Sequence, residues 1–179
     1  MIQGTSFCKK KETIHPSDDA GSLHDRLMIS GAELLVETLD RLVENKLQEV
    51  PQSQIKGGRQ ELRDAPKLNK ENTRINWYNE ADAINNFVRG LSPYPGAHTE
   101  LFINSAEEKK KVIVYRANPV NELCDGDPGT LAGVKKKLKV NAGKGTVEIT
   151  ELKVQGKKRM DATSFLNGNK LSKENDFFK

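Results

Sequence analysis

The chain has 179 residues and a formal net charge of +4 at pH 7; 35% of its residues are hydrophobic and 30% are charged. A chain of this length can bury a core and form one domain or two small ones. It has no apolar run long enough for a transmembrane helix, and no apolar segment follows the basic residues 9–11 to suggest a signal peptide. The two cysteines, Cys8 and Cys124, have no metal-binding or disulfide spacing, which favours a reducing cytoplasm.

The first 45 residues predict one strand and one long helix. Residues 5–14 could form a strand, although no partner for it is evident. Ser22, with Asp25 three residues later, approximates a capping box and predicts a helix from Ser22 to about Asn45. Its leucines lie roughly on one side, and this apolar face needs a covering surface or stays exposed. Residues 46–72 are rich in Pro, Gly and polar residues and predict a linker.

The stretch from Arg74 to Leu101 predicts a capped helix followed by a turn. Asn79 is a good N-cap, and apolar residues recur at helical spacing from Ala81 to Leu91. The sequence of residues 92–96, SPYPG, cannot continue a helix because each Pro lacks an N–H.

Short strands dominate the remainder of the chain. Strands are predicted at 97–103, 111–117, 130–134, 138–140 and 146–154, with a turn at 141–145, a short helix at 162–167 and a frayed tail at 172–179. Several short strands with one helix near the start predict a small β-barrel.

Four segments resemble the carboxy-terminal half of methionyl-tRNA formyltransferases, and they occur in the family order. They are AGSLHDRLMISGAELLVETL (20–39), APKLNKENTRINW (65–77), RINWYNEADAINNFVRGLSPYPGAHTEL (74–101) and GKKRMDATSFLNG (156–168). The resemblance implies a mixed α and β fold: the terminal helix of a lost α/β, Rossmann-like formyltransferase domain, a linker, and a small open β-barrel of OB-like type with one packed helix. It divides the chain into a catalytic-domain remnant (1–45), a basic interdomain linker (46–73), a tRNA-binding barrel (74–171) and the frayed tail (172–179).

The catalytic residues of the family have no counterpart in this sequence. Formyl transfer to an amine needs a deprotonated nucleophile and a stabilised oxyanion. The resemblance implies that an Asn, a His in a motif like HPSLLP and an Asp in a segment like DTG supply these. Only His15, Pro16 and Ser17 mimic the first motif, and residues 2–4 stand where the second would lie. We therefore predict no catalytic residue, no metal site and no bound cofactor in this chain; formyl-tetrahydrofolate is implied only for the complete enzyme.

The remaining chemistry predicts binding of a polyanion. Residues 101–160 contain thirteen Lys or Arg against seven Asp or Glu, a net charge of +6 that exceeds that of the whole chain. Phosphate contacts from such residues give salt-dependent affinity. Among the aromatic residues, Trp77, Phe87 and Tyr94 could stack on bases, but packing of the helix on the barrel is the preferred interpretation. The resemblance implies that Lys67, Lys70 and Arg74 of the basic linker lie against the tRNA. With them, the predicted RNA-binding residues are Arg89, Lys135, Lys136, Lys137, Lys157, Lys158 and Arg159.

The resemblance implies initiator methionyl-tRNA as the partner, with a separately encoded catalytic half as a second candidate partner and no membrane. Two alternatives stay open. The barrel could be the terminal domain of a sugar-nucleotide formyltransferase, in which the lysine clusters are incidental, or the chain could be a non-functional remnant. Salt-sensitive tRNA binding would distinguish the tRNA-binding hypothesis from both alternatives.

Overall fold

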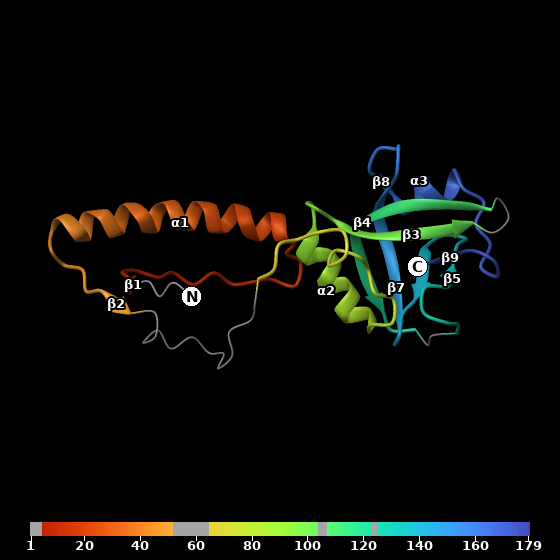
Figure 1. Cartoon of the computed structure of the whole chain (residues 1–179), viewed down its shortest axis with the longest axis horizontal. Coiled ribbons are helices and arrows are strands. Elements are labelled where there is room, and N and C mark those ends of the chain that lie inside the picture. Colours follow the sequence, from red (N-terminus) through yellow and green to blue (C-terminus); the bar gives the residue numbers. More distant parts are fainter. Residues whose placement is uncertain (1–4, 52–64, 104–106, 123–124) are drawn as a thin grey trace. The chain divides into compact units, whose positions relative to one another are not determined.

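A computed structural model of the chain describes residues 5–51, 65–103, 107–122 and 125–179. The chain divides into two compact units, 1–67 and 68–179. Figure 1 shows the chain with its helices and strands labelled where there is room. No helix among the described residues combines the length and the apolarity needed to cross a bilayer.

The first unit holds one long helix and a minimal pair of strands. Helix α1 spans Ala20–Val43, and β1 (Thr5–Ser6) pairs antiparallel with β2 (Val50–Pro51). The predicted strand through residue 14 is therefore reduced to two residues. Its partner strand β2 lies in the segment predicted as linker. Local sequence patterns do not predict such a long-range pairing.

Helix α1 begins two residues earlier than predicted. Asp19 is the N-cap: its carboxylate accepts a hydrogen bond from the Ser22 backbone N–H at 2.8 Å, and the Ser22 hydroxyl accepts one from the Asp19 N–H at 3.2 Å. The capping box is thus formed by Asp19 and Ser22, because the first free amides of the helix are satisfied by these two side chains.

A buried carboxylate reinforces this helix start. Asp18 is 7% exposed and accepts hydrogen bonds from the Arg26 guanidinium at 2.6 and 2.7 Å and from the His15 backbone N–H at 2.6 Å. The hydrogen bonds from Arg26, followed by the one from His15, hold the pKa of Asp18 well below its ordinary value. The segment around His15 therefore has a structural role at the beginning of α1.

The lowered pKa of Asp18 predicts an acid-sensitive helix start. The stabilisation from ionised Asp18 is present above the unfolded pKa of an Asp, about 3.9, and is lost as the pH falls through the lower folded-state pKa. We expect Asp18→Asn to reduce amide protection factors in the first turn of α1 at pH 7, as measured by hydrogen exchange. The exposed Asp25→Asn should leave them unchanged. Equal protection in Asp18→Asn and the wild type would contradict the role assigned to Asp18.

The apolar face of α1 is largely exposed, which is one of the two outcomes that the sequence leaves open. Ser30 is the one buried residue of the helix. Four of its leucines are about half exposed, namely Leu27 at 48%, Leu35 at 60%, Leu39 at 51% and Leu42 at 51%, whereas Leu23 and Leu34 are partly buried.

The second unit is a curled antiparallel sheet with α2 (Ala81–Leu91) packed against it. The strand order is β5-β6-β7-β4-β3-β9, and β8 pairs with β7. The strands are β3 (Ala97–Ile103), β4 (Glu108–Val120), β5 (Leu131–Gly133), β6 (Leu138–Asn141), β7 (Thr146–Val154), β8 (Met160–Asp161) and β9 (Phe177–Phe178). The predicted barrel is therefore present as a nearly closed sheet.

Helix α2 buries the predicted apolar stripe. Ala81, Ile84, Val88 and Leu91 are each no more than 6% exposed and join the core of the sheet. The N-cap position is Glu80 and not Asn79, and its side chain makes no capping hydrogen bond. The Ala81 N–H instead donates to the Lys144 carbonyl at 3.0 Å, so a turn distant in sequence satisfies the helix start.

The end of the chain closes the sheet, and the prediction of a frayed tail is wrong. Strand β9 pairs with β3, and an isolated bridge joins Phe177 to Thr130, directly before β5. The Phe178 N–H donates to the Gly129 carbonyl at 2.7 Å, and the Phe178 side chain is 2% exposed. Burial of this ring and the backbone pairing on both sides outweigh the polar composition of the preceding residues.

The interior of the sheet is capped by α3 (Ala162–Asn167) at the position predicted. Asp161 is its N-cap and accepts a hydrogen bond from the Ser164 N–H at 2.8 Å, while Phe165 is 1% exposed. Trp77 is 4% exposed and donates through Nε1 to the Thr99 hydroxyl at 3.0 Å. The segment before α2 is thereby anchored in the core.

Candidate nucleic-acid interface

Three adjacent strands present one continuous outer surface. Buried and part-exposed side chains alternate along β3, so His98 and Glu100 point outward. The register places His98 opposite Ile113 of β4, and Ile113 opposite Lys153 of β7. Two residues further along β3, Glu100 lies opposite Lys111. The pairing of β3, β4 and β7 thus brings together side chains as distant in the sequence as His98 and Lys153.

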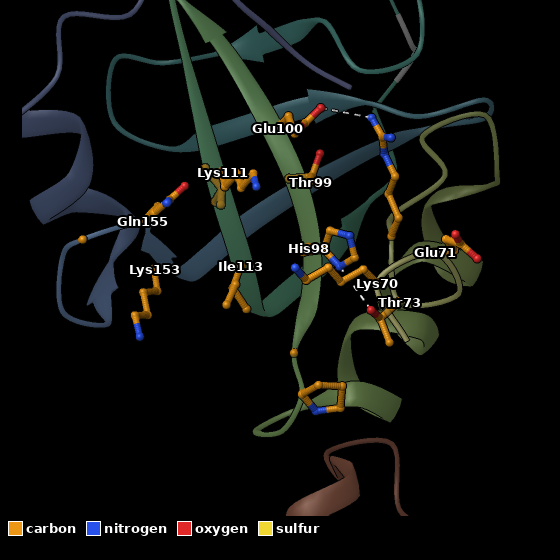
Figure 2. Close-up of a pocket in the computed structure, with 15 residues that line it drawn as sticks. Lys70, Glu71, Thr73, His98, Thr99, Glu100, Lys111, Ile113, Lys153 and Gln155 are labelled. Carbon is orange, nitrogen blue, oxygen red and sulfur yellow. Dashed lines mark hydrogen bonds and ion pairs between the residues drawn. The ribbon is translucent and has the colours of Figure 1, made fainter. Parts of the chain in front are cut away.

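The linker forms one wall of a groove over this surface. The His98 N–H donates to the Thr73 carbonyl at 3.0 Å, and the Ile75 N–H donates to the His98 carbonyl at 2.8 Å, so residues 73–75 run parallel to the start of β3. The groove between the linker, the strands and the turn after β7 has a volume of about 750 Å³ (Figure 2). Its charged lining consists of four cationic residues, Lys70, Arg74, Lys111 and Lys153, and two acidic ones, Glu71 and Glu100, a net charge of +2.

Of the two acidic residues that line the groove, Glu100 is the one with close cation contacts in the described structure. Its carboxylate lies 2.9 Å from Lys109 Nζ and 3.3 Å from Arg74 Nη2. The hydrogen bond from Lys109, together with the charges of Lys109 and Arg74, lowers the pKa of Glu100. Glu100 therefore stays ionised near neutral pH and holds Arg74 along the edge of the groove.

His98 occupies the middle of the groove. Its Nδ1 lies 3.1 Å from the Thr73 hydroxyl, and the ring faces the space between the linker and Ile113 (Figure 2). Burial lowers the pKa of His98 below its ordinary value of 6.5, and the positive charge of Arg74 lowers it further. In the free chain the imidazole is therefore neutral at pH 7.

Two of the predicted linker residues, Lys70 and Arg74, line this groove, whereas Lys67 is exposed and belongs to the first unit. The basic cluster 157–159 directly follows Gly156, which also lines the groove. Lys157 and Lys158 are exposed and form no ion pair with any carboxylate in the described parts of the chain. Arg159 pairs with Glu151 and lies 4.3 Å from the centre of the Tyr115 ring.

The other predicted cations lie outside the groove. Residues 135–137 form the turn between β5 and β6, and Lys137 pairs with Glu148 at 2.8 Å. Lys135 and Lys136 are exposed there and have no carboxylate partner within the described ranges. Arg89 is half-buried on the last turn of α2 and donates to the Asn86 side-chain carbonyl at 2.8 Å. The predicted residues therefore fall into a groove set, a β5–β6 turn set and two separate positions.

Sequence reasoning missed two cations of the groove, Lys111 and Lys153. Lys153 lies at an outward position of an alternating strand, and Lys111 ends the basic run 109–111, which is one of the lysine clusters of the sequence. Their convergence on His98 depends on the register between β3, β4 and β7, which alternation within one strand does not specify.

The three aromatic residues have different environments. Trp77 is buried and Phe87 packs against the core, as the preferred interpretation predicted. Tyr94 is 88% exposed, so the prediction that it packs α2 onto the barrel is wrong. It lies in the turn after α2, where the chain reverses before β3 and leaves the ring no apolar surface to cover.

The described residues contain no group of three or more His, Cys, Asp or Glu side chains arranged to hold a metal ion. The groove instead combines cations, one neutral histidine and backbone polar groups on a nearly closed sheet. This combination suits a ligand with separated negative charges, as in the phosphate backbone of a nucleic acid.

Comparisons with known proteins agree with this architecture. Methionyl-tRNA formyltransferase from Flavobacterium johnsoniae is 35% identical over 171 residues, covering 96% of this chain and 52% of that protein. The protein of the same name from Geobacter metallireducens is 38% identical over 169 residues, covering 94% of this chain and 50% of that protein. The chain thus spans about half the length of these relatives.

A solved structure shares the fold. The structure of HypX from Aquifex aeolicus in complex with tetrahydrofolic acid matches with a TM-score of 0.53 and 22% identity, covering 75% of this chain and 22% of that one. The family model for the C-terminal domain of formyl transferases matches residues 67–170. The chain therefore belongs to the family of the formyl transferase C-terminal domain.

Proposed function

We propose that this chain binds the initiator methionyl-tRNA through the groove and the basic turn beside it. The observation that carries the proposal is the set of cations without carboxylate partners in the described structure: Lys70, Lys111, Lys153, Lys157 and Lys158. They lie on the linker, on two neighbouring strands and on the turn after β7. The named activity of the relatives, methionyl-tRNA formyltransferase, supplies the class of RNA.

Such a surface binds an RNA helix by its backbone. The major groove of A-form RNA is too deep and narrow for side chains, so proteins recognise these helices mostly by shape and by phosphate and 2′-hydroxyl contacts. Lysines without carboxylate partners suit this role. They can bind phosphates, and so release the counterions condensed on the RNA, without first breaking an ion pair within the protein. Arg159, which is held by Glu151 and Tyr115, is better suited to shaping the turn than to contacting RNA.

The proposal assigns the binding step to this chain and formyl transfer to the complete protein. Transfer of a formyl group from formyl-tetrahydrofolate requires an oxyanion-stabilising and base-providing set of residues. The groove offers a neutral His98 hydrogen-bonded to Thr73, with its cations placed for phosphate binding. We expect the chain by itself to bind tRNA and to give no formylated product when formyl-tetrahydrofolate is added.

Binding of initiator tRNA should weaken steeply with salt. With one phosphate contact for each of the five lysines that carry the proposal, we expect the dissociation constant to rise by about 500-fold between 50 and 200 mM salt. Fluorescence anisotropy with labelled initiator tRNA measures this, with an elongator tRNA as the specificity control. Absence of binding at low salt would refute the proposal and favour the sugar-nucleotide alternative or a non-functional remnant.

A pair of substitutions locates the surface. Lys157→Ala with Lys158→Ala should lower the affinity and reduce the slope of log K against log salt by about 2 units, or about 1 for each lost phosphate contact. Lys9→Ala with Lys11→Ala removes the same charge from exposed positions of the first unit and should leave the slope unchanged. The same change at Lys135 and Lys136 tests whether the RNA also reaches the β5–β6 turn.

A further inference from the structure

The hydrogen bonds around His98 determine its tautomer. The Thr73 hydroxyl donates its single proton to the Asn69 carbonyl at 2.6 Å. It can therefore only accept at His98 Nδ1, 3.1 Å away, so Nδ1 carries the proton. In the neutral imidazole, Nε2 is then left with a lone pair and no proton. A negatively charged oxygen can approach this atom favourably only after Nε2 gains a proton.

Charged groups from every neighbouring element face this histidine. The linker contributes Lys70, Glu71 and Arg74, β3 contributes Glu100, and β4 contributes Lys111. Lys153 of β7 lies beyond Ile113 on the same surface. Arg74, Lys70 and Lys111 oppose protonation of His98, while Glu100, itself paired with Lys109, favours it. Burial is the largest cause of the lowered pKa of His98, and among the charged neighbours the cations outnumber the acidic residues. The groove therefore has an excess of positive charge that a bound anion would neutralise.

We propose that His98 Nε2, Lys70 and Lys111 bind one phosphate group of the RNA backbone, and that His98 takes up a proton when this phosphate binds. This inference rests on the proposed RNA-binding function and adds to it a defined phosphate site with a linked proton. A phosphodiester is already ionised near neutral pH, so the proton comes from solvent. It forms the Nε2–H bond, and that N–H then donates to a phosphate oxygen.

A bound phosphate acts against the positive charge that, together with burial, keeps His98 neutral. Its negative charge compensates Lys70, Lys111 and Arg74, and its oxygen accepts a hydrogen bond from the charged imidazolium. The pKa of His98 must then rise on binding, and by linkage the affinity must rise as the pH falls. For one linked proton the limit is about tenfold tighter binding for each pH unit, between the pKa values of the bound and free forms.

The test is an NMR titration of the His98 Cε1–H resonance, with and without initiator tRNA, at low salt. We expect the pKa of His98 to rise in the complex, whereas the chemical shift of the exposed His24 on α1, compared at one fixed pH, should not change when RNA is added. This measurement needs no substitution. An unchanged pKa of His98 in a complex that still shows steep salt dependence would overturn this inference alone. Absence of any complex would instead refute the proposed function.

A substitution series checks the linkage in binding. In His98→Gln the dissociation constant should stay within about twofold of the wild type at pH 8 and lose the tightening that the wild type shows toward pH 6. His24→Gln should keep the wild-type pH dependence, and Lys111→Gln should weaken binding at both pH values. Retained tightening in His98→Gln would contradict the role of His98.

A titration with inorganic phosphate tests whether the site binds free phosphate or a phosphate of the RNA backbone. If inorganic phosphate raises the pKa of His98 and the RNA does so as well, the site binds the phosphate chemistry proposed. A rise with inorganic phosphate that is absent with RNA would overturn the assignment to the RNA backbone.

Discussion

Phe178→Ala is expected to lower the free energy of unfolding of the second unit by about 3–5 kcal/mol. The Phe178 ring is 2% exposed and lies against Trp77, with ring centroids 5.7 Å apart at 39°. Its removal leaves a cavity beside the tryptophan and weakens β9, the strand that closes the sheet between β3 and Thr130. Urea unfolding followed by tryptophan fluorescence measures the change, since Trp77 is the one tryptophan of the chain.

The matched control is Tyr94→Ala. It also removes an aromatic ring from the second unit, but Tyr94 is 88% exposed and its loss should change stability by no more than about 0.5 kcal/mol. Trp77 emission should shift to longer wavelength in native Phe178→Ala, because water reaches the cavity, and should not shift in Tyr94→Ala. A loss below about 1 kcal/mol for Phe178→Ala would contradict closure of the sheet by the chain end.

Gly129→Ala is expected to destabilise the same closure by more than about 2 kcal/mol. Gly129 has a φ of +93°, and a Cβ there would lie 2.2 Å from the Phe178 carbonyl oxygen. The Gly129 carbonyl also accepts the hydrogen bond from the Phe178 N–H at 2.7 Å. An alanine therefore combines an unfavourable backbone conformation with a clash against β9, which must shift and lose its pairing.

Two other glycines separate these effects. Gly156 has a φ of +79° and open space around the position of a Cβ, so Gly156→Ala should cost only the conformational term of about 1–2 kcal/mol. Gly90 lies in α2 with nothing within 4 Å of its Cβ position, and Gly90→Ala should stabilise by up to about 1 kcal/mol. If Gly129→Ala and Gly156→Ala have equal cost in urea unfolding, the clash with Phe178 is absent in solution.

The two large effects act on one structural feature. Phe178 and Gly129 contact each other directly across the closure, so their substitutions should not be additive. We expect the double variant Gly129→Ala with Phe178→Ala to be less destabilised than the sum of the two single variants, because the displaced strand has already lost its packing.

Several elements could be predicted from the sequence because their signals are local. The alternation of residues 97–103 and 146–154 and the helical stripe from Ala81 to Leu91 specify type and bounds closely. The basic clusters likewise indicate a polyanion-binding surface from composition alone. Lys157 and Lys158 are identifiable in this way, whereas Lys70 and Arg74 are identified by resemblance to the family's basic linker. The fold places all four at or beside the groove.

Local patterns are misleading where a distant partner decides the outcome. Residues 172–179 are mostly polar, and two phenylalanines alone carry no strand periodicity, so a frayed tail is the natural prediction. Pairing with β3 and with Thr130, together with burial of Phe178, makes this segment the closing strand. The start of α2 is similar, because the carbonyl of Lys144 replaces the expected side-chain cap.

The sequence by itself determined the family, the types of α2, α3 and the longer strands of the second unit, and the sign of its charge, because these reside in motifs, short-range periodicity and composition. Only the tertiary structure decided which charges act together. The register of β3, β4 and β7 brings Lys111 and Lys153 onto the same face of the sheet as His98. The backbone pairing of residues 73–75 with β3 places Thr73 and Lys70 beside this histidine. The physical reason is that registers and closures are set by contacts between distant segments, whereas periodicity reports only which side of one element is buried.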